Sequence, residues 1–409
     1  MPVASTLRRA AALMFGGLWL LVAPASNAAV QDITAVFRPD PGNPMVNKFT
    51  NTTPQSGVCP GHMPARCEAL GIFSIRTEAI KFNSIAPMAA GETDSRKRVM
   101  FKVPSDWQSF QVTSSLGEQQ TVQMRISGIG NRFDIPNPPG VLAWGADPNW
   151  TNPPAPCQHT GMWAAGPTLR LWFWLIPEGA GACGMASEVD IPRLHYFNFE
   201  YTYELRTPNP LGMSTGQYNG SITFTIGPNM DFDFGDIMIP TDNLLTFNFT
   251  LDVEHTLKVD VPPGGNQVEL LPQGGWQAWL QRNRRPERLF RDQTFNLSAS
   301  SRFRMNLECQ YTDGGDNCSI QEPVSGHRVP LNIAVSLPDG ITDGSGQSVN
   351  RRRLVRDGTG TELFLPGHYL DRKPGTLHFE VGSKDVESML DGVSKTYRGQ
   401  VTVIWDSAV

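Results

Sequence analysis

Thr-Tyr-Arg-Gly-Gln-Val-Thr-Val-Ile-Trp-Asp, residues 396–406, is the stretch of this sequence that decides its fold. Tyr397, Val401, Val403 and Trp405 share one phase of a period-two alternation, and the opposite phase is mostly polar. Alternation that uses β-branched and aromatic residues is typical of a half-buried β-strand. We therefore predict a strand here.

The position of this strand matters as much as its pattern. Only three residues follow Asp406, so no later segment covers the strand. Either earlier strands flank it on both sides, or one of its edges is open. An open apolar edge is an aggregation hazard, and proteins commonly manage it by pairing the edge with another chain. We predict that this protein is completed by other polypeptides.

The first residues have the pattern of a secretory signal peptide. Arg8 and Arg9 precede an apolar run, residues 10–23, and small residues at Ser26 and Ala28 match a cleavage site. A transmembrane anchor is the alternative, but the run is shorter than the ~20 residues that a span needs. We expect residues 1–28 to be a signal peptide and the mature protein to be soluble and exported.

The charge of the mature chain argues against nucleic acid as a partner. Removal of residues 1–28 takes away two arginines and no acidic residue, which changes the formal net charge from −5 to −7. Nucleic-acid binding typically requires basic patches on a basic domain. The length predicts two or three domains.

Six cysteines follow the signal, and an even number in an exported chain indicates disulfides. We predict pairing between neighbours in the sequence, each bond contributing about 2–4 kcal/mol. The chain has no Cys-x-x-Cys and no zinc-ribbon spacing, so we predict no metal site. The predicted pairs are Cys59–Cys67, Cys157–Cys183 and Cys309–Cys318.

Short strands separated by Pro- and Gly-rich turns account for most of the chain. The strongest apolar run, Leu169 to Ile176, lies between two prolines and predicts a central core strand. A second block with alternating apolar positions begins near Leu245, and the acidic, turn-rich region before it is the best boundary. Residues 29–58 show no clean alternation, and we expect an extended segment that pairs in places. This pattern predicts all-β sandwich domains at 29–244 and 245–409.

The sequence carries no recognisable enzyme signature. Gly-x-Ser-x-Gly, His-Glu-x-x-His, Walker and Rossmann patterns are all absent. Trp172 and Trp174 fit a packed core better than a sugar-stacking platform. We expect no enzyme activity and no cofactor; a carbohydrate-active enzyme remains an alternative that would need a pair of catalytic carboxylates in a cleft.

Arginine clusters stand out in this acidic chain. Arg96, Lys97 and Arg98 precede a strand, and two further clusters lie at 282–291 and 351–356. Most charge runs are solvated faces, but arginines on loops also hold acidic sugars or sulfates through paired hydrogen bonds. We give the first cluster the greatest weight as a binding site.

Ordered landmarks in the second half resemble a known family. They resemble the tip subunits of alpha-type chaperone–usher fimbriae, the CblD-like pilus biogenesis initiators related to colonization-factor tip adhesins. The resemblance covers the second domain well and the first more weakly, through Cys59, the apolar strand at Leu169 and residues 218–226. The landmarks are Leu257–Gly264, Val268–Trp276, Val329–Gly340 and Tyr397–Asp406.

This resemblance implies two immunoglobulin-like β-sandwich domains, the first a receptor-binding adhesin domain and the second a pilin domain that lacks its last strand. A periplasmic chaperone would fill the gap first, and at the outer-membrane usher the N-terminal strand of the next pilin subunit would replace it. The protein would pass through the periplasm of a Gram-negative bacterium to the fimbrial tip at the cell surface. The weakly patterned stretch after the signal fits a subunit that accepts a strand and donates none.

The resemblance also implies site residues. The pairing strand would present Tyr397, Val401, Val403 and Trp405. Enteric relatives place an Arg-Arg pair of a sugar pocket near the end of the adhesin domain, where only Arg206 matches here, and their second-domain cysteines are spaced farther apart. Arg96 or Arg98 resembles another pocket arginine by position. A host glycan or glycoprotein is the expected ligand, and the alternative is a purely structural initiator. The receptor-binding candidates are therefore Arg96, Lys97, Arg98 and Arg206.

Overall fold

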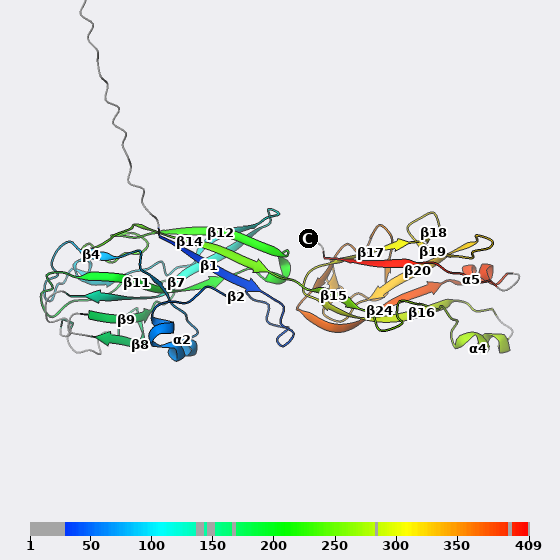
Figure 1. Cartoon of the computed structure of the whole chain (residues 1–409), viewed down its shortest axis with the longest axis horizontal. Coiled ribbons are helices and arrows are strands. Elements are labelled where there is room, and N and C mark those ends of the chain that lie inside the picture. The colour runs from blue at the N-terminus through cyan, green and yellow to red at the C-terminus, as the bar shows by residue number, and fades with distance from the viewer. Residues whose placement is uncertain are drawn as a thin grey trace, which may run out of the picture.

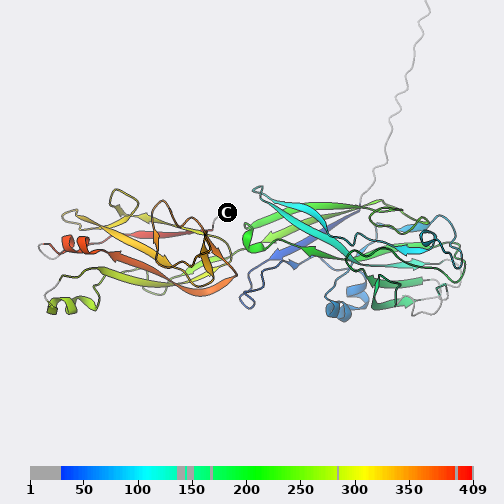
Figure 2. The same ribbon diagram turned by 180° about the vertical axis from the view of Figure 1, so that it is seen from behind.

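The computed structural model describes residues 29–135, 143–144, 152–165, 169–282, 285–391 and 395–407, so the expected signal peptide lies outside the described residues. Two bodies rich in β-strand lie end to end (Figures 1 and 2). The prediction of an all-β fold is confirmed. The first body contains β1 (Ala29–Phe37), β2 (Thr50–Asn51), α1 (Val58–His62), α2 (Pro64–Leu70), β3 (Ile75–Thr77), β4 (Phe82–Ser84), β5 (Val99–Phe101), β6 (Gln108–Ser114), β7 (Gln119–Asp134), β8 (Gln158–Ala165), β9 (Leu169–Leu175), β10 (Cys183–Met185), β11 (His195–Arg206), β12 (Gly216–Thr225), β13 (Met238–Pro240) and β14 (Leu244–Val253), with 3₁₀ turns at Ser95–Lys97 and Pro210–Gly212.

The second body is smaller and contains its own core. Its elements are β15 (Leu257–Asp260), α4 (Gly275–Arg282), β16 (Leu289–Ala299), β17 (Arg304–Cys309), β18 (Tyr311–Thr312), β19 (Cys318–Gln321), β20 (Arg328–Ser336), β21 (Ile341–Asp343), β22 (Arg352–Leu354), β23 (Phe364–Pro366), β24 (Leu370–Val381), α5 (Ser383–Met389) and β25 (Val401–Asp406). The alternating residues predicted the strands of this body, whereas the short helix α4 was not predicted.

One large sheet organises the first domain. Its strands follow the order β13-β4-β11-β7-β6-β12-β14-β1-β2, and β9 also pairs with β7 and carries β8. Trp172 and Trp174 on β9 are fully buried, and both rings pack against Phe101 with centroid distances of 4.6 and 5.9 Å. The interpretation of these tryptophans as core residues is therefore confirmed.

The expectation of an extended segment that pairs in places is confirmed, but the first described strand, β1, is longer and more regular than its residues indicated. It pairs in parallel with β14 along its whole length, from Ala29 opposite Leu245 to Phe37 opposite Val253. Ile33 and Phe37 are buried in the first domain's core. The pattern was missed because small and polar residues fill most of the strand. As a result, β1 is already used as a strand of its own domain.

The chain passes from one sheet to the other at residues 254–256. β14 pairs with β12 and β1 in the first sheet, whereas β15 pairs with β16 in the second. His255 lies at this junction, where its Nε2 donates to the Met213 carbonyl (2.9 Å) and its Nδ1 contacts the Ser300 hydroxyl (3.1 Å). Although His255 lies on the apolar phase of the alternation, its side chain makes polar contacts at the junction between the two sheets and is not a core residue.

The second domain has two groups of strands around one core. One sheet has the order β15-β16-β24-β20-β19-β18, with β22 on β20, and β17 pairs separately with β25. Phe295, Leu297, Ile333 and Val335 are among the residues that fill the space between them. This is the sandwich that the alternating strands predicted.

The three predicted disulfides are confirmed. Cα–Cα distances are 5.7 Å for Cys59–Cys67, 6.0 Å for Cys157–Cys183 and 5.3 Å for Cys309–Cys318. Within the described part of the chain, no helix is long and apolar enough to cross a bilayer.

Candidate functional site: the open edge of the second domain

The C-terminal strand β25 is where the sequence predicted a strand. It pairs antiparallel with β17, from Arg304 opposite Asp406 to Cys309 opposite Val401. Upstream, the backbone of Arg398 exchanges two hydrogen bonds with Gln321 (2.9 and 3.0 Å). The regular strand therefore covers only the second half of the predicted stretch. The first half is held by backbone hydrogen bonds such as those between Arg398 and Gln321.

One edge of β25 has no ladder partner among the described residues, because β17 is the only strand that pairs with it there. β15 is likewise the last strand of its sheet, paired on one side with β16. Each of the two strand groups of the second domain therefore ends in an edge with unpaired backbone donors and acceptors. Such edges are templates for a further strand.

Burial distinguishes these edge strands from their neighbours. On β17, the inward side chains of Met305 and Leu307 are buried almost completely. On β25, the side chains of Val401, Val403 and Trp405 pack against the same core but remain only partly buried. The same is true of a set on and after β15. This second set consists of Leu257, Val259, Val268 and Leu270.

Trp405 shows how the open edge is anchored. Its ring contacts Phe295 edge-on at a centroid distance of 5.0 Å and Phe303 at 5.7 Å. The edge strands thus direct apolar side chains into the core as inner strands do. Part of the surface of these side chains nevertheless remains exposed to solvent. Because burial contributes about 25 cal/mol per Å² of apolar surface, covering these side chains with a further strand would stabilise the domain.

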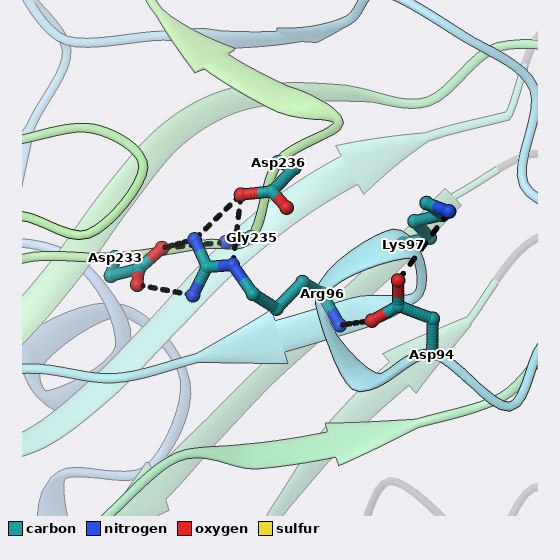
Figure 3. Close-up of polar contacts among 6 residues, drawn as sticks. All are labelled: Asp94, Arg96, Lys97, Asp233, Gly235 and Asp236. Carbon is teal, nitrogen blue, oxygen red and sulfur yellow. Dashed lines mark hydrogen bonds and ion pairs between the residues drawn. The ribbon is translucent and has the colours of Figure 1, made fainter.

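The predicted receptor residue Arg96 forms an ion-pair cluster (Figure 3). Its guanidinium donates to the Asp233 carboxylate at 2.8 Å and to Asp236 at 2.7 and 2.8 Å. Asp233 is buried, and burial by itself raises the pKa of a carboxyl group. The hydrogen bonds from Arg96 and the Gly235 amide, together with the charge of Arg96, outweigh burial, so the pKa of Asp233 lies below its usual value. The hydrogen bonds to Asp233 and Asp236 raise the pKa of Arg96.

The backbone holds this cluster in place. The Asp94 side chain accepts from the Arg96 amide, which starts the 3₁₀ turn, and the Asp236 amide donates to the Arg96 carbonyl at 2.8 Å. Gly235 has φ +83°, and a Cβ there would lie 2.6 Å from the Arg96 carbonyl oxygen. This close approach requires glycine. Arg96 thus joins the turn before β5 to the loop before β13.

The remaining predicted receptor residues lie in other surroundings. Lys97 is exposed and 3.4 Å from Asp94, and Arg98 is half-buried with no hydrogen-bond partner for its Nε. Arg206, at the end of β11, places its guanidinium 3.9 Å from the centre of the Trp107 ring and 3.7 Å from Glu178. Arg206 and Arg96 therefore have separate sets of partners. Sequence reasoning missed Trp107, because a single tryptophan in a loop carries no signal.

The other two arginine clusters contain residues that face acidic partners. Arg288 lies 3.2 Å from Glu380, and Arg351 lies 3.6 Å from Asp292. The Asp313 carboxylate accepts from the Gly315 amide and the Asn317 side chain, which forms a tight turn inside the disulfide loop. Across the described ranges no group of three or more potential metal ligands gathers.

Comparisons with known proteins give structural likeness only. No known family and no curated protein matches the sequence. One similar solved structure belongs to the chaperone–tip adhesin complex described as vital for synergistic activation of CFA/I fimbriae biogenesis; it has 10% identity and a TM-score of 0.26, and the match covers 94% of this chain and 97% of that one. Another belongs to the CsuC–CsuE chaperone–tip adhesion subunit pre-assembly complex from archaic chaperone–usher Csu pili of Acinetobacter baumannii, with 9% identity, a TM-score of 0.22 and coverage of 93% and 98%. Over most of its length, the chain is thus similar to chains from two chaperone–tip subunit complexes.

Proposed function

We propose that this protein is a minor tip subunit of a chaperone–usher fimbria and that its second domain accepts strands from other polypeptides. The observation that carries this proposal is the half-covered core at the edges of β15 and β25. A domain that is complete by itself buries its inward apolar residues, as β17 does with Met305 and Leu307. The resemblance of the second-domain landmarks to tip subunits points to the same function.

The edge geometry suggests how a partner would bind. An incoming strand would offer its backbone groups to the free edge of β25, and alternate side chains would cover the partly exposed apolar residues. A periplasmic chaperone would bind first, and the donor strand of the next pilin subunit would replace it at the usher. Because β1 is already paired with β14, the first described strand is not free to complete another subunit.

A supplied strand is expected to stabilise the protein. We would extend the whole chain after Val409 with a flexible linker and a strand of alternating apolar and polar residues. Covering the half-exposed side chains should contribute about 3 kcal/mol, which corresponds to a rise in Tm of about 10 °C for a domain of this size. Calorimetry measures the shift.

A linker and strand of the same composition, with the alternation scrambled, provide the control. The scrambled extension should leave Tm unchanged, since its apolar side chains cannot all face the core. Equal Tm values for the two extended chains would overturn the assignment of the edge as a strand acceptor.

We further propose that the first domain binds a host glycan or glycoprotein, with Arg96, Lys97, Arg98 and Arg206 as the candidate residues. Of Arg96 and Arg206, Arg206 is the more accessible, because 56% of its side chain is exposed. Its guanidinium lies over the Trp107 ring. Arg96 contributes to the shape of the loops, since its donors are already used. Many copies on a cell surface would compensate for weak binding at each site.

A glycan array with the whole mature chain tests receptor binding. Loss of the guanidinium in Arg206→Ala should weaken signals from sulfated or sialylated glycans about tenfold, because charge-assisted hydrogen bonds contribute about 1.5–3 kcal/mol. Arg38→Ala is the matched control, since Arg38 is exposed and paired with Glu254 at 2.6 Å. An array without any signal would favour the alternative, a structural initiator without a ligand.

A further inference from the structure

Phe197 is an exposed aromatic residue in a strand that is otherwise largely buried. Its side chain is 39% exposed, whereas Tyr196, Phe199 and Tyr201 on the same strand, β11, are fully buried. β11 pairs with β4 near this point, and Figure 1 shows β4 at the end of the first domain that faces away from the second. Phe197 is therefore near the end of the first domain that faces away from the second domain.

A β-bulge turns this side chain outward. Tyr196 lies opposite Phe133 and Asn198 lies opposite Arg132, so Phe197 is the extra residue in the ladder between β11 and β7. The Asn198 side chain accepts a hydrogen bond from the Arg132 amide at 3.2 Å, so the irregular ladder leaves that amide satisfied. Bulges are frequent next to functional sites because they redirect side chains.

Polar side chains surround the ring. The guanidinium of Arg132 lies 5.4 Å from its centre, and the imidazole of His195 contacts it edge-on at 4.4 Å. The Nδ1 of His195 lies 2.5 Å from the Asn83 side-chain oxygen, and Arg132 lies 3.7 Å from the Asp134 carboxylate. We call these five residues, Asn83, Arg132, Asp134, His195 and Phe197, the Phe197 surface.

The Phe197 surface is close to electrically neutral. The charge of Arg132 is balanced by that of Asp134. Burial lowers the pKa of His195; the charge of Asp134 opposes this effect and that of Lys81 adds to it, so the imidazole is neutral at pH 7. Half of the Arg132 side chain (49%) and part of Asp134 (29%) remain exposed. Uncommitted donors and acceptors thus surround an apolar ring without a dominant charge.

We propose that the Phe197 surface binds a neutral hexopyranose at the end of a glycan. The proposal rests on the proposed function insofar as the first domain binds glycans, and it places part of that binding away from Arg206. The C–H face of a pyranose is apolar and packs on an aromatic ring, while its hydroxyl groups both donate and accept. The amide of Asn83, the guanidinium of Arg132 and the carboxylate of Asp134 offer both kinds of partner.

The test uses the whole mature chain on an array of glycans that end in neutral hexoses, N-acetylhexosamines or acidic sugars. Phe197→Ala should reduce binding to neutral-hexose termini about tenfold, because loss of an aromatic contact costs about 1.4 kcal/mol. Phe197→Tyr keeps the ring and should restore binding. Arg38→Ala, at an exposed arginine that pairs with Glu254 away from the Phe197 surface, should leave the neutral-hexose signals unchanged. Thermal unfolding of each variant checks that the exposed substitution leaves the fold intact.

Each other outcome overturns the assignment in a different way. Neutral-hexose binding that survives Phe197→Ala removes the Phe197 surface as the site but leaves receptor binding in place. Signals from acidic termini alone exclude the neutral ligand. An array that is blank for the unmodified chain removes both this inference and the receptor-binding part of the proposed function, while strand acceptance is tested separately by the extended chain.

Discussion

Removal of residues 401–409 is expected to abolish stable capture of the protein by a periplasmic chaperone. The deletion takes away β25, the strand whose free edge would pair with the partner, and it uncovers the β17 edge along the whole ladder from Arg304 to Cys309. Trp405 no longer covers Phe295 and Phe303, so the second domain loses part of its core as well. Co-purification of the truncated chain with a tagged chaperone from periplasmic extract measures the effect.

Single substitutions separate pairing from general unfolding. Val403 lies on the inward phase of β25 and packs against the core, whereas Thr402 lies on the outward phase and is exposed. Val403→Asp puts a charge where the partner's side chains would meet the core, so it should reduce capture nearly as much as the deletion. Thr402→Ala should leave capture close to that of the unmodified chain. Recovery of the truncated chain in a stable chaperone complex would falsify the strand-acceptor model.

Local patterns predicted the features that depend on local sequence. Period-two alternation identified β25 because a strand with one covered face needs apolar residues at every second position, whether or not its edge is paired. Pairing between neighbouring cysteines identified the three disulfides, whose sequence separations are 8, 26 and 9 residues, because the cost of closing a loop grows only slowly with its length. The apolar run of β9 indicated a strand buried on both faces.

Features that depend on distant partners were not predictable in the same way. β1 runs parallel to β14, which is more than 200 residues away in the sequence. The residues of β1 alone do not indicate which strand it pairs with. The alternation in 247–261 keeps its phase through His255, although the chain leaves one sheet there and enters another. A periodic pattern reports which face is apolar; it does not report which sheet the strand joins.

The candidate binding residues show the same division. Arg96 looks like an exposed loop arginine in the sequence, because Asp233 and Asp236 follow it by 137 and 140 residues. Phe197 looks like one more aromatic residue of a core strand, since the bulge that turns it outward is set by pairing with β7. In both cases residue type was informative and position in the fold decided the role.

Replacement of Arg96 by alanine is expected to destabilise the first domain by about 3 kcal/mol near neutral pH. The substitution leaves the buried carboxylate of Asp233 without its main partner, and breaking a buried ion pair costs about 3–5 kcal/mol. The estimate is at the lower end because Arg96 itself is partly exposed. Urea unfolding of the whole chain, compared between Arg96→Ala and the unmodified protein, measures the loss.

The pH dependence distinguishes this explanation from a loss of packing. In the unmodified chain the pKa of Asp233 is depressed, so its contribution is present above the unfolded value, about 3.9, and is lost as the pH falls through the folded value. In Arg96→Ala the largest effect that opposes burial is lost, so the pKa of Asp233 should rise and protonation should relieve the penalty. The difference in stability should therefore shrink as the pH is lowered toward about 3.

Lys97→Ala is the matched control for this prediction. Lys97 neighbours Arg96 but is exposed and only 3.4 Å from Asp94, so its loss should change stability by less than about 0.5 kcal/mol at any pH. A destabilisation in Arg96→Ala that is equal at neutral and acidic pH would show that side-chain packing, and not the ion pair, holds the two loops together. Any fall in glycan binding by Arg96→Ala must be judged against this loss of stability, because the same guanidinium that resembles a receptor contact already binds two carboxylates of its own chain.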